Sequence, residues 1–508
     1  MDQKKHGFVK WLLAIGLALL SLTFIVQFML VNPDRAAYRT SAAVAATADF
    51  QNCRFGVGVA LNSITTYNYT PTRAGWYINW GTGTQPPSGM EFYHTIRLKQ
   101  NKLGATYLPT YVITPALSSG PGGLEPFVQA NPGEVWLIGN EQERSYYQDE
   151  TLPDMYAQIY HDAYTFIKGI DPTAKVAIGG VIQPTPLRLQ YLDKVLAAYQ
   201  LKFGMSMPID IWNIHMYILQ EVAGSWGASI PVGISATVGM VYTPPQSLDL
   251  GIFSSLVRDM RTWMKSRGYQ NKPLIVTEYG VLFPMWLLND QYGLTQADIN
   301  QFINDSTNYL NTAVDVDLGY PADGYRLVQQ AAFYSLDDDS RDDQGDYRWG
   351  SFIFNSTPPY TLTAAGIQFI NTMEDMPASV DLLPVSASTE PATLLVQNAG
   401  PITATLNVMI ANAGNSRQTS LIRVRFWDIT SGGQVQLQPD SVLTSMINGC
   451  GTTQAVTTSV PNLEAGAHTI RVEVDPDQQI TEASELNNLL TVTILVGTHS
   501  LYLPFVLR

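Results

Sequence analysis

The chain has 508 residues, enough for one large domain and at least one more. Its 29 basic and 43 acidic side chains give a net charge of −14, which argues against a nucleic-acid partner. The two cysteines, Cys53 and Cys450, are too few for a disulfide framework. Two free or buried thiols are the favoured interpretation, and a bond between them stays the alternative.

Residues 1–31 are predicted to be a signal peptide or a signal anchor. Lysines precede an uncharged apolar run from Trp11 to Val31, close to the ~20 residues that cross a bilayer. This arrangement places the rest of the chain outside the cell. Small residues at 43–48 offer cleavage sites, so secretion and attachment to the membrane are equal alternatives. Residues 32–50, rich in Ala, Thr and Ser, are the expected linker.

Residues 51–376 alternate strand-like and helix-like segments, which predicts an α/β fold, a (β/α)8 TIM barrel. Strands are expected at 55–59, 74–81, 135–138, 175–180, 209–217, 273–280 and 328–336, and helices at 153–170, 187–199, 247–267, 295–313 and 363–373. Segments 92–98 and 107–113 are both strand-like. One of them is the third barrel strand and the other an insertion.

Two apolar strand segments each end with a glutamate. Segment 135–141 closes with Asn140 and Glu141, and segment 273–280 carries Glu278. In a (β/α)8 barrel the carboxyl ends of the strands hold the active site. A pair of carboxyl groups there suits glycoside hydrolysis, in which one group protonates the leaving oxygen and the other attacks or activates water. We therefore predict that Glu141 and Glu278 form a catalytic pair.

Further motifs occur at the expected strand ends. His215 and Tyr217 lie near the end of the sixth strand, Tyr279 follows Glu278 on the seventh, and an aromatic stretch occupies 76–80. Together these motifs resemble the large clan of retaining glycosidases with barrel folds. Within it they are most similar to the glycosyl-hydrolase catalytic-core family that includes endo-β-1,3-glucanases. The resemblance spans most of 55–375 and is concentrated in four short motifs.

The resemblance implies a role for each matching residue. Asn140 would hydrogen-bond the sugar 2-hydroxyl, Glu141 would be the acid/base, and Glu278 would be the nucleophile. Desolvation next to a second carboxylate would keep Glu141 protonated, and donors on His215 or Tyr217 would keep Glu278 ionised. The full set of expected substrate-binding residues is Asn140, His215, Tyr217, Trp76, Trp80, Tyr279 and Tyr334. No metal and no cofactor is expected.

Several residues depart from the family pattern or have a plain structural alternative. Gln142 follows Asn-Glu where many relatives have proline, and Phe333-Tyr334 stands where a tryptophan commonly ends the eighth strand. Trp76 and Trp80 have the alternative of core packing, and His215 that of a buried, hydrogen-bonded histidine. These departures concern the substrate and its subsites more than the two glutamates.

Two acidic features near the expected site are given structural interpretations. Glu143 lies close to Glu141, and we expect a structural or solvent-exposed role for it. Residues 337–343 contain several aspartates that could bind Ca²⁺ through their oxygens. Because the loop lacks the spacing of a known calcium loop, a solvated acidic loop is the favoured interpretation.

Residues 377–508 change to short alternating runs of Val, Thr, Ile, Leu and Ala, which predicts an all-β Ig-like sandwich. Asn412-Ala413-Gly414, the stretch 463–468, and 474–488 with its Glu-Leu-Asn-Asn end resemble the CARDB family of bacterial cell-adhesion-related domains. That resemblance implies a spacer or binding appendage. The apolar end at 501–505 is expected to form a last strand.

The sequence thus predicts an exported glycoside hydrolase, secreted or held at the cell surface, that acts on β-glycosidic bonds of a polysaccharide. β-1,3-Glucan is the substrate that the resemblance implies. The alternative is a surface protein with a degenerate barrel that binds glycan without cleaving it. The two hypotheses differ in one respect, since only an enzyme needs Glu141 and Glu278 across one cleft.

Overall fold

A computed structural model of the chain describes residues 51–83, 86–145, 148–342, 345–395 and 400–498. The expected signal or anchor segment, the linker up to residue 50 and the predicted strand at 501–505 lie outside the described residues. Within the described ranges, every helix is too short or too polar to cross a membrane.

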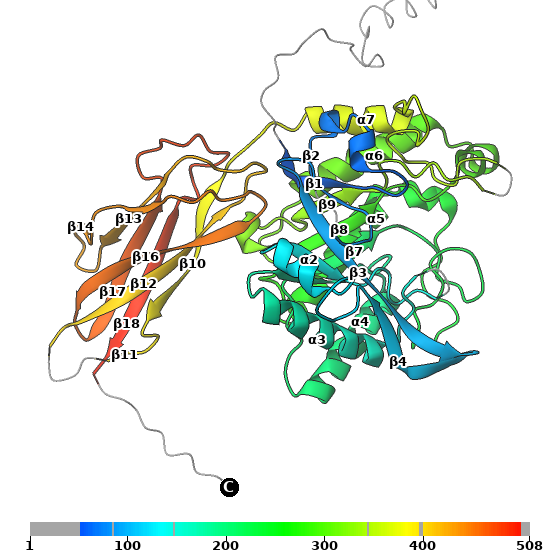
Figure 1. The fold of residues 1–508 in the computed structure, drawn as a ribbon. Helices are drawn as coiled ribbons and strands as arrows, with labels where there is room; N and C mark the ends of the chain where they lie inside the picture. Colours follow the sequence, from blue (N-terminus) through cyan, green and yellow to red (C-terminus); the bar gives the residue numbers. More distant parts are fainter. Residues whose placement is uncertain (1–50, 84–85, 146–147, 343–344, 396–399, 499–508) are drawn as a thin grey trace, which may run out of the picture. The chain divides into compact units, whose positions relative to one another are not determined.

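Eight parallel strands form a barrel in the N-terminal part of the chain (Figure 1). They are β1 (Asn52–Gly58), β2 (Ala74–Ile78), β3 (Glu91–Leu103), β5 (Val135–Ile138), β6 (Lys175–Ile178), β7 (Trp212–Met216), β8 (Leu274–Tyr279) and β9 (Gln330–Phe333). Neighbours pair in the order β6-β5-β3-β2-β1-β9-β8-β7. Parallel bridges from Ala177 to Ile211 and from Val181 to Ile214 join the two ends. The predicted eight-stranded barrel is therefore confirmed.

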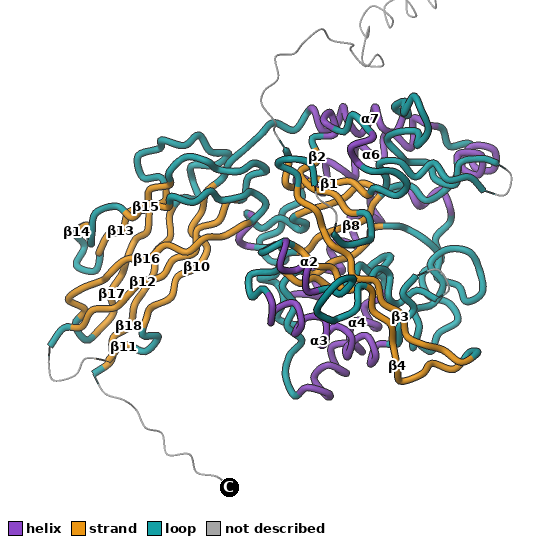
Figure 2. The backbone as a smooth tube through the Cα atoms, viewed as in Figure 1, coloured by secondary structure: helices purple, strands orange, loops and turns teal. Residues whose placement is uncertain are grey.

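The third barrel strand is β3, which contains the segment 92–98. Strand β4 (Thr106–Thr114) pairs with it in antiparallel fashion and is the insertion. Figure 2 shows this hairpin running out from the barrel. Sequence alternation is the same in both segments, so only the pairing partners distinguish them.

Helices cover the outside of the barrel. They are α2 (Glu125–Ala130), α3 (Pro153–Ile170), α4 (Pro186–Phe203), α5 (Leu250–Ser266), α6 (Gln296–Thr312) and α7 (Ala364–Glu374). Helices α3 and α4 begin with proline, whose missing N–H costs nothing in the first turn. In α5 the Asp249 side chain accepts the N–H of Ile252, and Phe253, Met260 and Met264 form its buried face.

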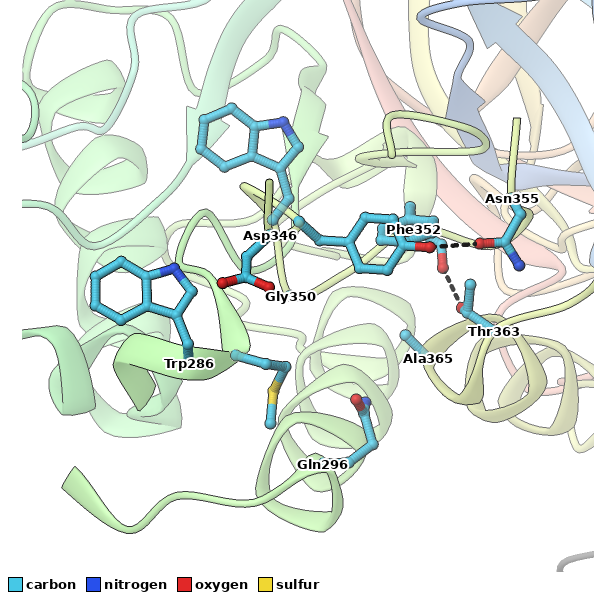
Figure 3. A pocket seen from close by; sticks show the side chains of 11 residues that line it. Trp286, Gln296, Asp346, Gly350, Phe352, Asn355, Thr363 and Ala365 are labelled. Carbon is cyan, nitrogen blue, oxygen red and sulfur yellow. Dashed lines mark hydrogen bonds between the residues drawn. The ribbon is translucent and has the colours of Figure 1, made fainter. Parts of the chain in front are cut away.

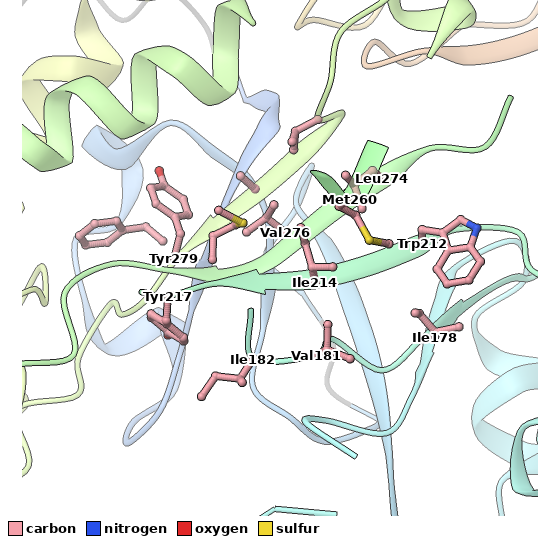
Figure 4. Close-up of a cluster of buried hydrophobic side chains, with 14 of the residues drawn as sticks. Ile178, Val181, Ile182, Trp212, Ile214, Tyr217, Met260, Leu274, Val276 and Tyr279 are labelled. Carbon is pink, nitrogen blue, oxygen red and sulfur yellow. The ribbon is translucent and has the colours of Figure 1, made fainter. Parts of the chain in front are cut away.

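Apolar side chains fill both sides of the strands. Between strands and helices, Ile214 of β7 and Val276 of β8 pack near Met260 of α5 (Figure 4). A separate cluster fills the barrel interior, where the rings of Trp76 and Tyr93 stack with centroids 4.3 Å apart. The interior is thus a packed core, and the open end of the barrel is left for chemistry.

The C-terminal part is a β-sandwich, as predicted. One sheet contains β10 (Leu382–Glu390), β12 (Ile402–Asn412) and β16 (Thr452–Leu463). The other contains β11 (Leu394–Leu395), β13 (Ile422–Asp428), β14 (Val435–Gln436), β15 (Ser441–Leu443), β17 (Gly466–Val474) and β18 (Leu489–Gly497). Alternate residues such as Leu406, Val408 and Ile410 are fully buried, so the two sheets share an apolar core.

The two cysteines form a disulfide bond, and the expectation of free thiols was wrong. Cys53 lies in β1 and Cys450 in the turn before β16, with their Cα atoms 6.1 Å apart. This distance is within the range that a disulfide spans. The bond joins positions 397 residues apart, a proximity that cysteine spacing alone does not reveal.

We predict that this bond stabilises the protein measurably. Because it closes a loop of 397 residues, its loss should cost about 2 to 5 kcal/mol. A thiol reductant should lower the melting temperature of the wild type, followed by circular dichroism. Cys450→Ser should melt at that lower temperature with or without reductant. An unchanged melting temperature of the wild type in the presence of the reductant would contradict the prediction.

Candidate active site

Glu141 follows β5 on a backbone that few residues adopt. Gly139 has φ 95° and Glu141 itself has φ 46°, in the left-handed region. The Glu141 N–H donates to the carbonyl of Gly180 at 2.9 Å, which ties this turn to the end of β6. A non-glycine residue in this region costs about 1 to 3 kcal/mol and persists where the surrounding structure enforces it. The turn therefore directs the carboxylate of Glu141 with little freedom.

Glu278 and His215 come from adjacent strands. His215 of β7 pairs in register with Glu278 of β8. Nδ1 of His215 lies 3.1 Å from Oε1 of Glu141 and 3.5 Å from Oε2 of Glu278. One oxygen of each carboxylate and a nitrogen of the imidazole all lie within 4.8 Å of one another. The structure thus brings Glu141, Glu278 and His215 together.

Two aromatic side chains donate to Glu278. The indole N–H of Trp80 donates to Oε1 at 2.8 Å, and the hydroxyl of Tyr217 donates to Oε2 at 3.0 Å. The Tyr334 ring meets the rings of Trp80 and Tyr217 edge-on, with centroids 5.6 and 6.4 Å away. These contacts fix both donors, so the Glu278 carboxylate sits in a preformed cradle.

Arg144 is a residue of the site that the sequence gave no reason to select. Its Nη1 donates to Oε2 of Glu141 at 2.8 Å, and its Nη2 donates to the carbonyl of Gly227 at 3.3 Å. It follows Glu141 by three positions in the loop between β5 and α3. The only signal in the sequence was a cation close to a catalytic candidate, a pattern common on protein surfaces.

The pKa directions in the free protein are opposite to those expected. Burial acts to raise the pKa of Glu141, but the charges of Arg144 and His215 outweigh it and lower that pKa to about 2. Burial raises the pKa of Glu278, with His215 opposing. Burial acts to lower the pKa of His215, but the carboxylates of Glu278 and Glu141 outweigh it and raise that pKa. The free protein therefore holds Glu141 ionised, and its surroundings favour protonation of the adjacent imidazole.

The other predicted binding residues fall into two groups. Asn140 is at the site, where its side-chain N–H donates to Gln148 at 3.2 Å, and Tyr334 borders it through its ring. Trp76 and Tyr279 are fully buried away from it. Trp76 packs in the barrel interior, so its core alternative holds. The Tyr279 hydroxyl lies 3.1 Å from that of Thr307 on α6, because Tyr279 points out of the barrel.

Both acidic features near the site are structural. Glu143 is fully buried and accepts the N–H of Ile182 at 2.9 Å. Asp337 is also fully buried and accepts backbone N–H groups of Ala60 and Asn62, each at 2.7 Å. The expectation of a solvated loop was therefore wrong for Asp337, whose carboxylate ties the loops after β1 and β9 together.

Within the described residues, one group of acidic and imidazole side chains has the spacing to share a cation, and it is Glu141, His215 and Glu278. The neighbouring side chains favour hydrogen bonds to these carboxylates over coordination of a cation. A guanidinium already occupies one oxygen of Glu141, and an indole and a phenol donate to Glu278. These donors satisfy ionised carboxylates without a metal.

A cavity borders this cluster through Arg144, and a smaller one adjoins that cavity. The larger, of about 500 Å³, is lined by Arg144, the indoles of Trp226, Trp286 and Trp349, and apolar residues of the loop after β8. A second cavity of about 220 Å³ shares Trp286 and Trp349 and extends toward Gln296 and Phe352 (Figure 3). Aromatic faces with a few polar groups are typical of sugar-binding cavities.

Comparison with known proteins gives a family for the C-terminal part. Residues 379–492 match the CARDB family. This confirms the resemblance seen in the sequence. A search of curated protein sequences found no match to this chain.

Solved structures with a similar fold include glycoside hydrolases. A GH128 endo-β-1,3-glucanase from Amycolatopsis mediterranei is 14% identical, with 63% of this chain and 98% of that chain covered and a TM-score of 0.38. A β-xylosidase from Caulobacter crescentus is 10% identical, with 81% and 94% covered and a TM-score of 0.40. A CARDB domain from Pyrococcus furiosus is 18% identical, with 24% and 99% covered and a TM-score of 0.20.

We predict that Tyr217→Phe raises the pKa of Glu278, because a donor that favours the ionised carboxylate is lost. The pKa can be measured by NMR of protein labelled with ¹³C at the glutamate carboxyl carbon. Tyr279→Phe is the matched control, since that hydroxyl contacts Thr307 instead. An unchanged pKa of Glu278 in Tyr217→Phe, or an equal pKa shift in Tyr279→Phe, would show that the Tyr217 hydroxyl does not stabilise the ionised carboxylate.

Proposed function

We propose that this chain is an exported glycoside hydrolase that cleaves β-glycosidic bonds of a polysaccharide with retention of configuration. The observation that supports it most is the convergence of Glu141 and Glu278, an oxygen of each lying within 4.8 Å of the other. Retaining enzymes place their carboxyl groups about 5 to 5.5 Å apart, whereas inverting enzymes need about 6.5 to 9.5 Å to admit a water.

Each side chain of the cluster has a part in this reaction. Glu278 attacks the anomeric carbon while Glu141 protonates the departing glycosidic oxygen, which gives a glycosyl-enzyme ester. Glu141 then removes a proton from water, which hydrolyses that ester. Donation from Trp80 and Tyr217 holds the Glu278 carboxylate ready for attack and stabilises it again as it leaves. Asn140 is proposed to bind the sugar 2-hydroxyl.

The larger cavity is the proposed binding place for the polymer. Its tryptophans offer flat apolar faces against which pyranose rings can stack. β-1,3-Glucan is the first substrate to test, with xylan, mannan and cellulose beside it.

We further propose the division of the chain into a signal or anchor at 1–31, a linker at 32–50, the catalytic barrel at 51–376 and a sandwich at 377–508. The CARDB-like part would act as a spacer or binding aid outside the cell. An N-terminal segment that is not cleaved would hold the enzyme at the membrane.

Loss of either glutamate should abolish hydrolysis. On the substrate that the wild type cleaves best, Glu278→Gln should lower kcat roughly 10⁴-fold or more, since the nucleophile is gone. Glu141→Gln should lower it about 10² to 10⁴-fold, the usual contribution of a general acid. Glu134→Gln is the control, because Glu134 precedes β5 at the other end of the barrel and contacts His94. Wild-type rates in Glu278→Gln would exclude this mechanism.

The stereochemical course gives a second, independent check. Because the two carboxyl groups lie too close to admit a water between Glu278 and the sugar, the first product formed should be the β-anomer. Proton NMR during the first minutes of hydrolysis distinguishes the anomers before they interconvert. An initial α-anomer would assign Glu278 as a base and the enzyme as inverting.

A further inference from the structure

Both oxygens of the Glu141 carboxylate have partners in the structure. The imidazole of His215 lies 3.1 Å from Oε1, and the Arg144 guanidinium donates to Oε2 at 2.8 Å. The Glu141 side chain is only 3% exposed. A general acid must reach the oxygen that it protonates at hydrogen-bond distance. Glu141 therefore has to lose one of these partners before it can act on a glycosidic oxygen.

The packing decides which partner can leave. His215 is fully buried, and its ring already stands 2.5 Å from the place that a Cβ on Gly180 would take, so the imidazole is held tightly. Arg144 belongs to a loop, and its side chain is 21% exposed. It also lines the larger cavity, which gives the guanidinium space to turn into. A side chain bordering open space changes rotamer far more readily than one in a packed core.

We propose that Arg144 is a positioning residue that substrate displaces: its guanidinium holds the Glu141 carboxylate in the free protein and releases it when a sugar occupies the adjacent cavity. This inference rests on the proposed function and adds to it how Glu141 becomes a protonated general acid that can reach the substrate. The guanidinium of Arg144 lines the same cavity that would bind the sugar. A bound sugar and the guanidinium would therefore compete for the same space.

The proton that Glu141 needs is already next to it, on His215. While Arg144 stays, its positive charge favours the ionised carboxylate of Glu141. The carboxylates of Glu278 and Glu141 favour the protonated imidazole. Once Arg144 leaves, the proton crosses from Nδ1 of His215 to Oε1 of Glu141: the N–H bond breaks, the O–H bond forms, and both groups become neutral. Rotation of the freed carboxyl group then presents this proton to the cleft. Trp80 and Tyr217 still donate to Glu278 and favour its ionised form for attack.

Other charges around Glu141 have to be considered in any pH experiment. Besides Arg144 and His215, the carboxylate of Glu278 faces Glu141, and Glu143 lies close to Arg144. The larger cavity is also lined by the charged side chains of Arg348 and Asp342. Arg348 provides a matched control, because it is a guanidinium in the same cavity whose Nε donates to the carbonyl of Arg341, at 2.7 Å, rather than to Glu141.

The first test is the pH dependence of hydrolysis by Arg144→Met. The basic limb of kcat/KM reports the free enzyme and that of kcat the substrate complex. Removing a cation next to the proton should move the kcat/KM limb up by about one pH unit or more. The kcat limb should move clearly less, since Arg144 has already left in the complex. Arg348→Met should leave the separation of the limbs as in the wild type.

Two kinetic outcomes would overturn the inference. Equal movement of both limbs would mean that Arg144 stays on Glu141 in the complex. No movement of either would mean that it has no influence on the acid. In both cases hydrolysis itself, and its loss in Glu278→Gln, would still support the proposed function.

A binding experiment tests the inference without turnover. In a Glu278→Gln background, laminarihexaose binding can be measured by calorimetry in buffers of different ionisation enthalpy. Loss of the Arg144 charge raises the pKa at which the pair of His215 and Glu141 loses its shared proton. At a pH where the free protein has partly lost that proton, binding should therefore take up protons from the buffer. This uptake should disappear when Arg144→Met is added. Absence of binding, or equal uptake in both proteins, would refute the inference. If binding takes up protons but the wild type hydrolyses none of the polysaccharides, the displacement of Arg144 is supported and the proposed enzymatic function is refuted.

Discussion

Hydrogen bonds between neighbouring parallel strands place the carboxyl ends of β5, β7 and β8 at the same rim of the barrel. Through this constraint Glu141, His215 and Glu278, which are distant in the sequence, come within 4.8 Å of one another. The packed interior beneath them, with Trp76 and Tyr93 at its centre, keeps that rim rigid. A site held by strands is more precise than one held by loops.

Burying two carboxylates side by side is costly unless each has partners. Here every partner has a distinct origin. Trp80 and Tyr217 reach Glu278 from other strands, His215 lies between both acids, and Arg144 reaches back along its own loop. Three of these four partners are fixed in the packed barrel or its rim. Arg144 lies in a loop and lines the larger cavity, so the contact that governs the acid is next to open space.

The errors of the sequence analysis have a common physical cause. Trp76 lies in β2 and points into the barrel, but it is buried in the packed interior. Tyr279 lies in β8 and points outward, because the face that a residue occupies depends on register and the pairing of β8 is irregular just before Tyr279. Asp337 looks solvated in a run of aspartates, yet the loop after β1 closes over it. Cys53 and Cys450 are bonded although 397 residues separate them, and their spacing in the sequence gives no sign of that bond.

The sequence by itself determined the alternation of strands and helices, the sandwich that follows, and the pair Asn140-Glu141 with Glu278, because periodicity and strand-end chemistry are local properties. Only the tertiary structure decided that Arg144 contacts Glu141, that Glu141 is ionised in the free protein, and that the cysteines are joined. Charges and contacts between residues of different segments depend on distances in space. No local pattern in the chain encodes those distances.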